Sequence, residues 1–188
     1  GVESLVVTDN VFEGTGATVN GFAPSSYLMG LEFGCVYPYA SDTAVGRSTF
    51  ARNTVGRCAS SWLNFSYTAK GCWYMTFQDN VFDFSSNPHS AAAHNDSPWN
   101  SAANLNYCTF DGNTYTLGTA NNQPYYFVAG GTAGQGGHNT FTDEHWTKPS
   151  GTIGGACGMP FTDSDYTTCH FHLPKAVVFP ASATGSGN

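Results

Sequence analysis

Charged residues are scarce in this chain of 188 residues, and their scarcity excludes several classes of protein. Asp, Glu, Lys and Arg make up 10% of the sequence, against roughly 25% in ordinary soluble proteins. The six Lys and Arg residues are scattered singly, so the sequence predicts no nucleic-acid partner, which would need clustered cations. No apolar run approaches the roughly 18 residues of a membrane-spanning helix, and we expect no membrane insertion.

Closely spaced cysteine pairs are also missing. The absence of a C-x-x-C motif argues against zinc-ribbon, thioredoxin-like and c-type haem sites. An even number of cysteines in a charge-poor chain favours disulfides and an oxidising compartment, although their pairing stays open. The residues predicted to form disulfides are Cys35, Cys58, Cys72, Cys108, Cys157 and Cys169.

We therefore expect a secreted protein, either extracellular or attached to the cell surface. The sequons that begin at Asn64 and Asn95 are candidate N-glycosylation sites and fit that compartment. The chain starts without Met or a signal peptide, from which we expect a processed or excised polypeptide.

Helical patterns are rare as well, because Gly, Pro, Asn and Ser interrupt nearly every window long enough for an amphipathic helix. Short β-rich runs are common instead, for example residues 4–8, 72–77 and 125–128. The sequence thus predicts an all-β fold.

An internal repeat narrows the fold class. An Asn followed by a β-branched residue and then an apolar one recurs at intervals of 43, 27, 33 and 26 residues. Each Asn suits a corner between two strands, and stacked Asn amides can satisfy backbone groups along a structural ladder. The alternative is a β-sandwich or propeller with chance matches at its turns, but a sandwich would place turns about every 8–12 residues, so the longer spacing favours a solenoid. The predicted ladder residues are Asn10, Asn53, Asn80, Asn113 and Asn139.

The corner motifs at residues 9–12, 79–82 and 113–115 resemble the Asn-x-aromatic corners of right-handed parallel β-helix proteins, the pectate-lyase-like superfamily. The resemblance covers about residues 2–145. It implies a parallel β-helix of about five to six coils with long inserted loops. It leaves the function open, because this superfamily includes lyases, hydrolases, phage tailspikes, adhesins and non-enzymatic surface proteins.

The resemblance and the loop composition suggest a domain organisation. We expect one β-helix domain over residues 1–179, of which 146–179 form an irregular, disulfide-bearing part. Residues 180–188 are predicted to be a flexible tail or linker. Long insertions at 14–30 and 85–104 separate successive coils, and in solenoids such loops often carry the function.

Acidic residues near the corners are the candidates for catalysis. If the coils are in register, Asp9 and Asp79 lie on either side of Arg52, and such a group could act on a sugar. The simpler interpretation is a solvated corner with a loose ion pair. No catalytic motif of the superfamily can be mapped onto the chain, so the prediction leans against an enzyme.

The histidines form two groups, neither of which has an established metal-site spacing. His170 and His172 alternate along a predicted strand and would share one face, with Asp163 and Asp165 just upstream. His138 with Asp143, Glu144 and His145 makes a looser set. We predict no cofactor and no metal, and His170 and His172 are the candidates if a metal binds.

The aromatic residues divide into core and surface candidates. Trp99 and Trp146 are predicted to contact a ligand or partner, because we place them in loops. The corner aromatics are expected to fill the core: Phe12, Phe82, Tyr115 and Phe141.

Two functions from different classes remain. The preferred one is a secreted, disulfide-stabilised structural protein, a self-assembling fibre or surface-layer subunit with polysaccharide-binding or adhesive contacts. Its partners would be copies of itself, arranged head to tail or laterally, because the strand-like segment at residues 2–8 has no polar capping helix before it. The alternative is a polysaccharide-degrading enzyme, or a fragment of one, such as a lyase, a glycoside hydrolase or a tailspike-like depolymerase. A sugar-binding module lies between the two.

Overall fold

The structure, a computed structural model, contains twenty β-strands and no helix in the residues that it describes. The described residues are 4–13, 31–33, 48–56, 63–65, 72–83, 85, 99–100, 105–117, 123–126, 137–158, 161, 163–179 and 181–185. This part of the chain is all-β. It holds no helix with the length and apolar character needed to cross a membrane.

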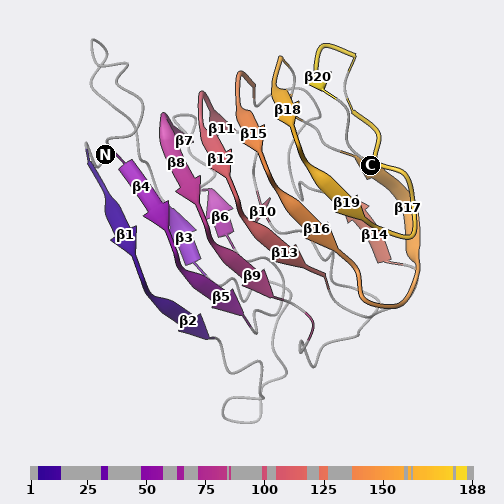
Figure 1. The fold of residues 1–188 in the computed structure, drawn as a ribbon, viewed down its shortest axis with the longest axis horizontal. Helices are drawn as coiled ribbons and strands as arrows, with labels where there is room; N and C mark the ends of the chain where they lie inside the picture. Colours follow the sequence, from indigo (N-terminus) through magenta and orange to yellow (C-terminus); the bar gives the residue numbers. More distant parts are fainter. Residues whose placement is uncertain are drawn as a thin grey trace.

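The first main sheet has seven strands in the order β1-β4-β8-β12-β15-β18-β20, and every pairing in it is parallel (Figure 1). Neighbouring strands pair in register, so that Phe50, Phe77 and Phe110 lie level with one another. The strands are β1 (Val6–Thr8), β4 (Ser48–Ala51), β8 (Met75–Gln78), β12 (Thr109–Asp111), β15 (Thr140–Thr142), β18 (Asp165–Thr167) and β20 (Thr184–Gly185).

The second main sheet has six parallel strands in the order β2-β5-β9-β13-β16-β19. Each of its six strands follows a strand of the first sheet after a corner of two residues, so the two sheets run side by side through the molecule. The strands are β2 (Val11–Glu13), β5 (Thr54–Gly56), β9 (Val81–Asp83), β13 (Thr114–Thr116), β16 (His145–Thr147) and β19 (His170–His172).

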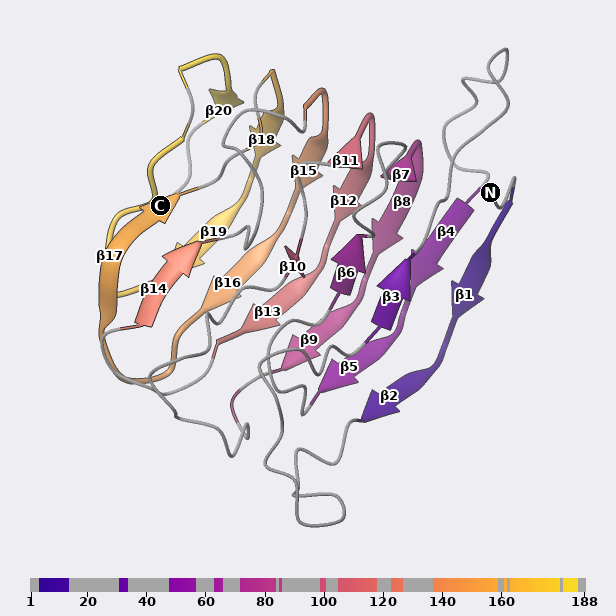
Figure 2. The same ribbon diagram turned by 180° about the vertical axis from the view of Figure 1, so that it is seen from behind.

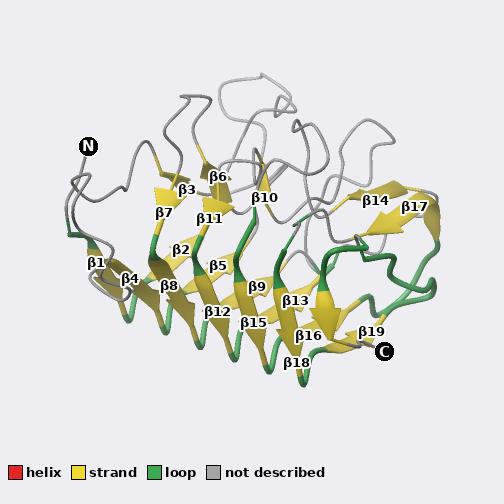
Figure 3. Cartoon of the chain, turned by 90° about the horizontal axis from the view of Figure 1, so that it is seen from above, coloured by secondary structure: helices red, strands yellow, loops and turns green. Residues whose placement is uncertain are grey.

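Three smaller parallel sheets lie on one side of the two main sheets (Figures 2 and 3). They consist of β3 (Leu31–Phe33), β6 (Leu63–Phe65) and β10 (Trp99–Asn100), of β7 (Cys72–Trp73) and β11 (Leu105–Asn106), and of β14 (Gln123–Tyr126) and β17 (Ile153–Gly158). Along the chain, a strand of the first main sheet is followed by one of the second and then, except after β19, by one or two strands of the small sheets. This recurring order is compatible with a β-helix-like solenoid.

Two columns of stacked aromatic rings fill the core beneath the main sheets. Alternate residues of a strand face opposite sides, so the middle residue of each three-residue strand points inward. Under the first sheet, the ring centroids of Phe77 and Phe110 are 4.8 Å apart and those of Phe110 and Phe141 are 4.6 Å apart. Under the second sheet, Tyr115 stacks on Trp146 at 3.6 Å. In-register pairing therefore brings the aromatic residues of successive repeats into face-to-face contact.

Trp146 is a core residue, which corrects its prediction as a ligand or partner contact. It is the middle residue of β16, is fully buried, and stacks between Tyr115 and Phe171. Phe141, which the sequence grouped with Phe82 and Tyr115, is also buried. It lies in the column under the first sheet, whereas Phe82 and Tyr115 lie under the second. The side chain of Trp99 lies outside the described residues.

The two ends of the stack differ. Strands β1 and β2 are the outermost strands of their sheets at the N-terminal end, and we call this pair the N-terminal edge. At the other end the stacking extends past residue 145, where the sequence predicted an irregular part, through β16, β18 and β19. Residues 173–179 then pack against the core at β18 and β19, and we call this segment the C-terminal cover. Its Phe179 ring meets Tyr166 and Phe171 edge-on, at 4.8 and 5.9 Å.

Candidate functional site

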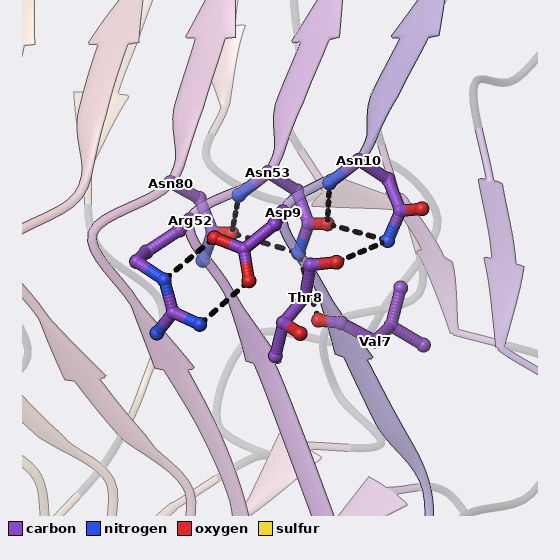
Figure 4. A network of polar contacts seen from close by, with 7 residues as sticks. All are labelled: Val7, Thr8, Asp9, Asn10, Arg52, Asn53 and Asn80. Atoms are coloured by element: carbon purple, nitrogen blue, oxygen red, sulfur yellow. Dashed lines mark hydrogen bonds and ion pairs between the residues drawn. The ribbon is translucent and has the colours of Figure 1, made fainter.

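Asparagine side chains link successive corners between the two main sheets (Figure 4). The Oδ1 atom of Asn53 accepts hydrogen bonds from the backbone N–H and the side-chain amide of Asn10, at 3.0 and 3.1 Å. Asn80 and Asn113 repeat this pattern, each accepting from the rung before it at 2.8–3.2 Å. The side-chain amides of the later rungs also donate to backbone carbonyls, for example Asn80 to Phe50 at 2.8 Å. These contacts satisfy backbone groups that the corner leaves unpaired.

We call the series of side chains from Asn10 through Asn113 the first-corner ladder, and its next rung is a glutamate. Glu144 is fully buried, and its Oε1 accepts hydrogen bonds from the backbone N–H and the amide of Asn113, at 3.0 and 2.8 Å. Burial raises the pKa of Glu144 from 4.5 to about 8, against the lowering effect of the hydrogen bonds from Asn113. The side chain is therefore mostly protonated at neutral pH, and the following rung is Cys169.

Asn139 lies on a different corner, which corrects the predicted ladder. Thr140 pairs with Thr109, so Asn139 is level with Cys108 and not with Asn113. Its Oδ1 accepts from the Cys108 backbone N–H at 2.9 Å, and its own N–H donates to Ser164 Oγ at 3.0 Å. Asn139 therefore belongs to a second ladder, at the entrance to the first main sheet.

Two of the six cysteines differ from the disulfide prediction. Cys108 and Cys169 are buried thiols and not half-cystines. They lie on different corner ladders, and burial raises the pKa of the Cys169 thiol to about 11, which keeps it protonated and unreactive. The side chains of the remaining four lie outside the described residues: Cys35, Cys58, Cys72 and Cys157. The same holds for the sequon residues Asn64 and Asn95.

The candidate catalytic residues Asp9, Arg52 and Asp79 form a surface ion pair and a turn contact. All three occupy the left-handed backbone region at φ 61°, 53° and 51°, which fits a sharp corner. Arg52 donates to both carboxylate oxygens of Asp9 at 2.7 Å, and this hydrogen bond lowers the pKa of Asp9 (Figure 4). Asp79 instead leans over Gly112, whose missing Cβ would come within 2.8 Å of Asp79 Oδ1. The arginine is therefore already neutralised by Asp9, on an exposed corner.

A cluster of Asp143, His145 and His170 lies on the outer face of the second sheet. His145 and His170 begin neighbouring strands, pair in register, and have rings stacked at 4.7 Å. Asp143 is the corner residue two positions before His145, and its Oδ1 is 3.5 Å from His145 Nε2 and 3.9 Å from His170 Nε2. All three side chains are at least 43% exposed. Among the described residues, this is the group whose donor atoms could hold a metal ion.

The other residues grouped with these histidines from the sequence lie apart from the cluster. His138 stacks on Tyr107 at the second corner, with centroids 4.7 Å apart. Asp163 donates its backbone N–H to Ser182 Oγ at 3.1 Å, and Asp165 Oδ1 accepts a hydrogen bond from the Thr184 hydroxyl. His172 is exposed two residues beyond His170 on β19.

Similarity to known proteins adds nothing to this geometry. The chain matches no protein-family model, no curated protein and no solved structure. The sequence could have indicated the cluster only through the correct register, because Asp143 and His170 are separated by a whole coil. The function is therefore inferred from the fold and from these side chains.

Proposed function

We propose that the chain is a right-handed parallel β-helix of about six coils, similar to the pectate-lyase-like superfamily in its corners. The parallel pairing of all strands in the described part of the chain supports this proposal, and so does the recurring order from the first main sheet to the second and then to a small sheet. The first-corner ladder supports it as well, since one rung falls in each coil from Asn10 to Glu144.

We further propose that the protein is a secreted, extracellular structural protein that associates with copies of itself through its N-terminal edge. The observation that carries this proposal is the exposure of that edge. The two main sheets end at β1 and β2, and Val6 on β1 and Val11 on β2 are 66% and 69% exposed. An outer strand also presents backbone N–H and C=O groups that can pair with another chain.

The first-corner ladder supports the same end of the molecule. Each rung from Asn53 to Glu144 accepts two hydrogen bonds from the rung before it, whereas no described residue donates to Oδ1 of Asn10. Asn10 is exposed, so its carbonyl oxygen can accept from a molecule placed against the edge. A second copy brings groups of the same kind.

The C-terminal end favours pairing between two N-terminal edges. The C-terminal cover places Phe179 against Tyr166 and Phe171, which shields the last aromatic residues of the core. Two N-terminal edges would form a two-fold, closed contact. Head-to-tail growth into a fibre would require the cover to move away from the last strands, where β20 already occupies the outer edge of β18.

The structural function is favoured over polysaccharide degradation by the state of the candidate catalytic residues. Arg52 is held by Asp9 in a two-pronged ion pair, and Asp79 is turned toward Gly112. The low content of charge and the wealth of neutral polar residues suit a durable extracellular material. Polysaccharide remains the surface partner that we propose for such a material.

Sedimentation velocity across a range of protein concentrations tests the proposal. We expect the wild type to form dimers as the concentration rises and the double variant Val6→Lys/Val11→Lys to stay monomeric, because edge lysines block strand pairing. Val178→Lys is the matched control, since Val178 is also 66% exposed but belongs to the C-terminal cover. A wild type that stays monomeric at the highest concentration would contradict self-association, and filaments under the electron microscope would support the fibre form.

A further inference from the structure

The Asp143–His145–His170 cluster brings together two imidazoles and one carboxylate from two coils. One donor atom from each residue lies within 4.8 Å of the other two. The pairing of β16 with β19 fixes the two histidines side by side, and the corner before β16 directs the carboxylate toward both Nε2 atoms. A contact of this kind arises from three separate features of the fold, namely strand register, corner position and side-chain direction.

We propose that this cluster binds a divalent transition-metal ion, with Zn²⁺ as the best match. Zn²⁺ prefers imidazole nitrogen and carboxylate oxygen at about 2.0–2.2 Å, which places tetrahedral ligand atoms about 3.3–3.5 Å apart. The distance of 3.5 Å between Asp143 Oδ1 and His145 Nε2 already meets this spacing, and 3.9 Å to His170 Nε2 is close to it. The side chains are exposed, so small rotations of the two rings can complete the approach.

The donor set decides between classes of metal. Ca²⁺ and Mg²⁺ take six or more oxygen ligands, and the cluster offers one carboxylate and two nitrogens. Two histidines and a carboxylate also hold Fe²⁺ in oxygenases. Those enzymes need a shielded pocket for their chemistry, whereas His145, His170 and Asp143 are 43%, 46% and 58% exposed. Zn²⁺ has no geometric preference from its d electrons and accepts three protein ligands with a water in the fourth position, which an exposed cluster can supply.

Buried neighbours and a backbone hydrogen bond anchor the backbone beneath the cluster, which reduces the cost of ordering the ligands. His145 precedes the buried Trp146, and His170 precedes the buried Phe171, so both histidine strands are anchored in the core. The N–H of Asp143 donates to the Thr167 carbonyl at 3.0 Å, which fixes the corner. A site built on anchored strands holds its ligands more precisely than one built on a loop. Three protein ligands leave the fourth position of a tetrahedral ion to water or to an atom of a bound molecule.

Isothermal titration of the full chain with ZnCl₂ tests this site, and a parallel titration with Co²⁺ reports four-coordinate geometry through its visible absorption. We expect one Zn²⁺ per chain. Asp143→Asn, His145→Ala and His170→Ala should each weaken binding by about tenfold or more, because each removes a direct ligand. His172→Ala is the matched control, as it removes an exposed histidine from the same strand as His170 and should leave the affinity unchanged.

A wild type that binds no Zn²⁺ up to millimolar concentration would overturn the proposal. Binding that survives both Asp143→Asn and His170→Ala, or that falls equally in His172→Ala, would overturn it too. Circular dichroism shows whether each variant is folded. Ring-nitrogen NMR of the unaltered chain gives the same answer without substitutions: Zn²⁺ should shift the signals of His145 and His170, and shifts confined to His138 and His172 would contradict the site.

Discussion

The N-terminal and C-terminal ends of the strand stack are finished in different ways. At the N-terminal edge, Val6 and Val11 are exposed, and the ladder ends in the exposed Asn10. At the other end the chain folds back as the C-terminal cover, and Phe171 is only 8% exposed. A regular repeat creates both ends equally, so the difference lies in residues outside the repeat.

The corner ladder shows the same contrast. Its first four rungs are asparagines, whose amides both donate and accept, and its last two are Glu144 and Cys169. An amide rung can accept hydrogen bonds from the rung before it without a change in protonation. A buried carboxyl must hold a proton to take the same place, since an unpaired buried charge is strongly unfavourable. The C-terminal half of the ladder is therefore sensitive to pH, and the N-terminal half is not.

The largest effect is expected from Glu144→Gln. The folded state holds a proton on Glu144 up to about pH 8, whereas the unfolded chain releases it near pH 4.5. The free energy of unfolding of the wild type therefore decreases as the pH rises between these values, by roughly 3 kcal/mol at pH 7. Glutamine has no proton to release, so the variant should lack this decrease. Urea unfolding at pH 5, 6, 7 and 8 measures it, and parallel curves for the two proteins would contradict the buried acid.

Asparagine rungs at the middle and at the end of the ladder should contribute different amounts to the free energy of unfolding. Asn80→Ala should lower the free energy of unfolding by about 2–3 kcal/mol, because it leaves buried groups of Asn53 and Phe50 without their hydrogen bonds. Asn10→Ala is the matched substitution at the exposed rung and should cost less than about 1 kcal/mol, since water can replace its contacts. Equal losses in denaturant titrations would mean that the ladder does not end at Asn10.

The C-terminal cover should contribute a smaller amount. Phe179→Ala removes a half-buried ring that meets Tyr166 and Phe171 edge-on, and we expect a loss of about 2 kcal/mol. The substitution also exposes the last aromatic residues, so the variant should bind a hydrophobic dye more strongly. Thermal unfolding unchanged from the wild type would show that the cover does not protect this end.

The smallest effect is expected at the exposed corner. Arg52→Ala breaks the ion pair with Asp9, but both side chains are more than half exposed and water solvates them well. The melting temperature should therefore stay within experimental error at 0.1 M salt. A clear decrease would assign the corner a structural role that its exposure does not suggest.

Much of the fold could be predicted from the sequence, because the repeat reflects local needs of the corner. Asn10, Asn53, Asn80 and Asn113 all follow a residue in the left-handed region and precede a β-branched residue. Asn139 has the same neighbours, since Thr140 and Phe141 begin a strand as Thr114 and Tyr115 do. The two corners of a coil make similar demands, so local pattern alone could not separate them. The rungs at Glu144 and Cys169 carry no asparagine and were missed.

The sequence indicated some of the residues of the candidate metal site but not how they come together. The alternation of His170 and His172 was visible, but a shared face places these two residues along one strand, about 7 Å apart. The cluster instead forms across strands, where neighbours are about 4.8 Å apart. Finding it required knowing that His145 pairs with His170. The sequence placed Asn139 on the rung after Asn113, where the structure has Glu144, and so did not give this register.

Amide hydrogen exchange measured at several protein concentrations tests the N-terminal edge most directly. If two copies pair through this edge, exchange in β1 and β2 should slow as the concentration rises, while exchange in β19 at the other end stays constant. Exchange in β1 and β2 that is independent of concentration, or slowing confined to β19, would contradict assembly through the N-terminal edge.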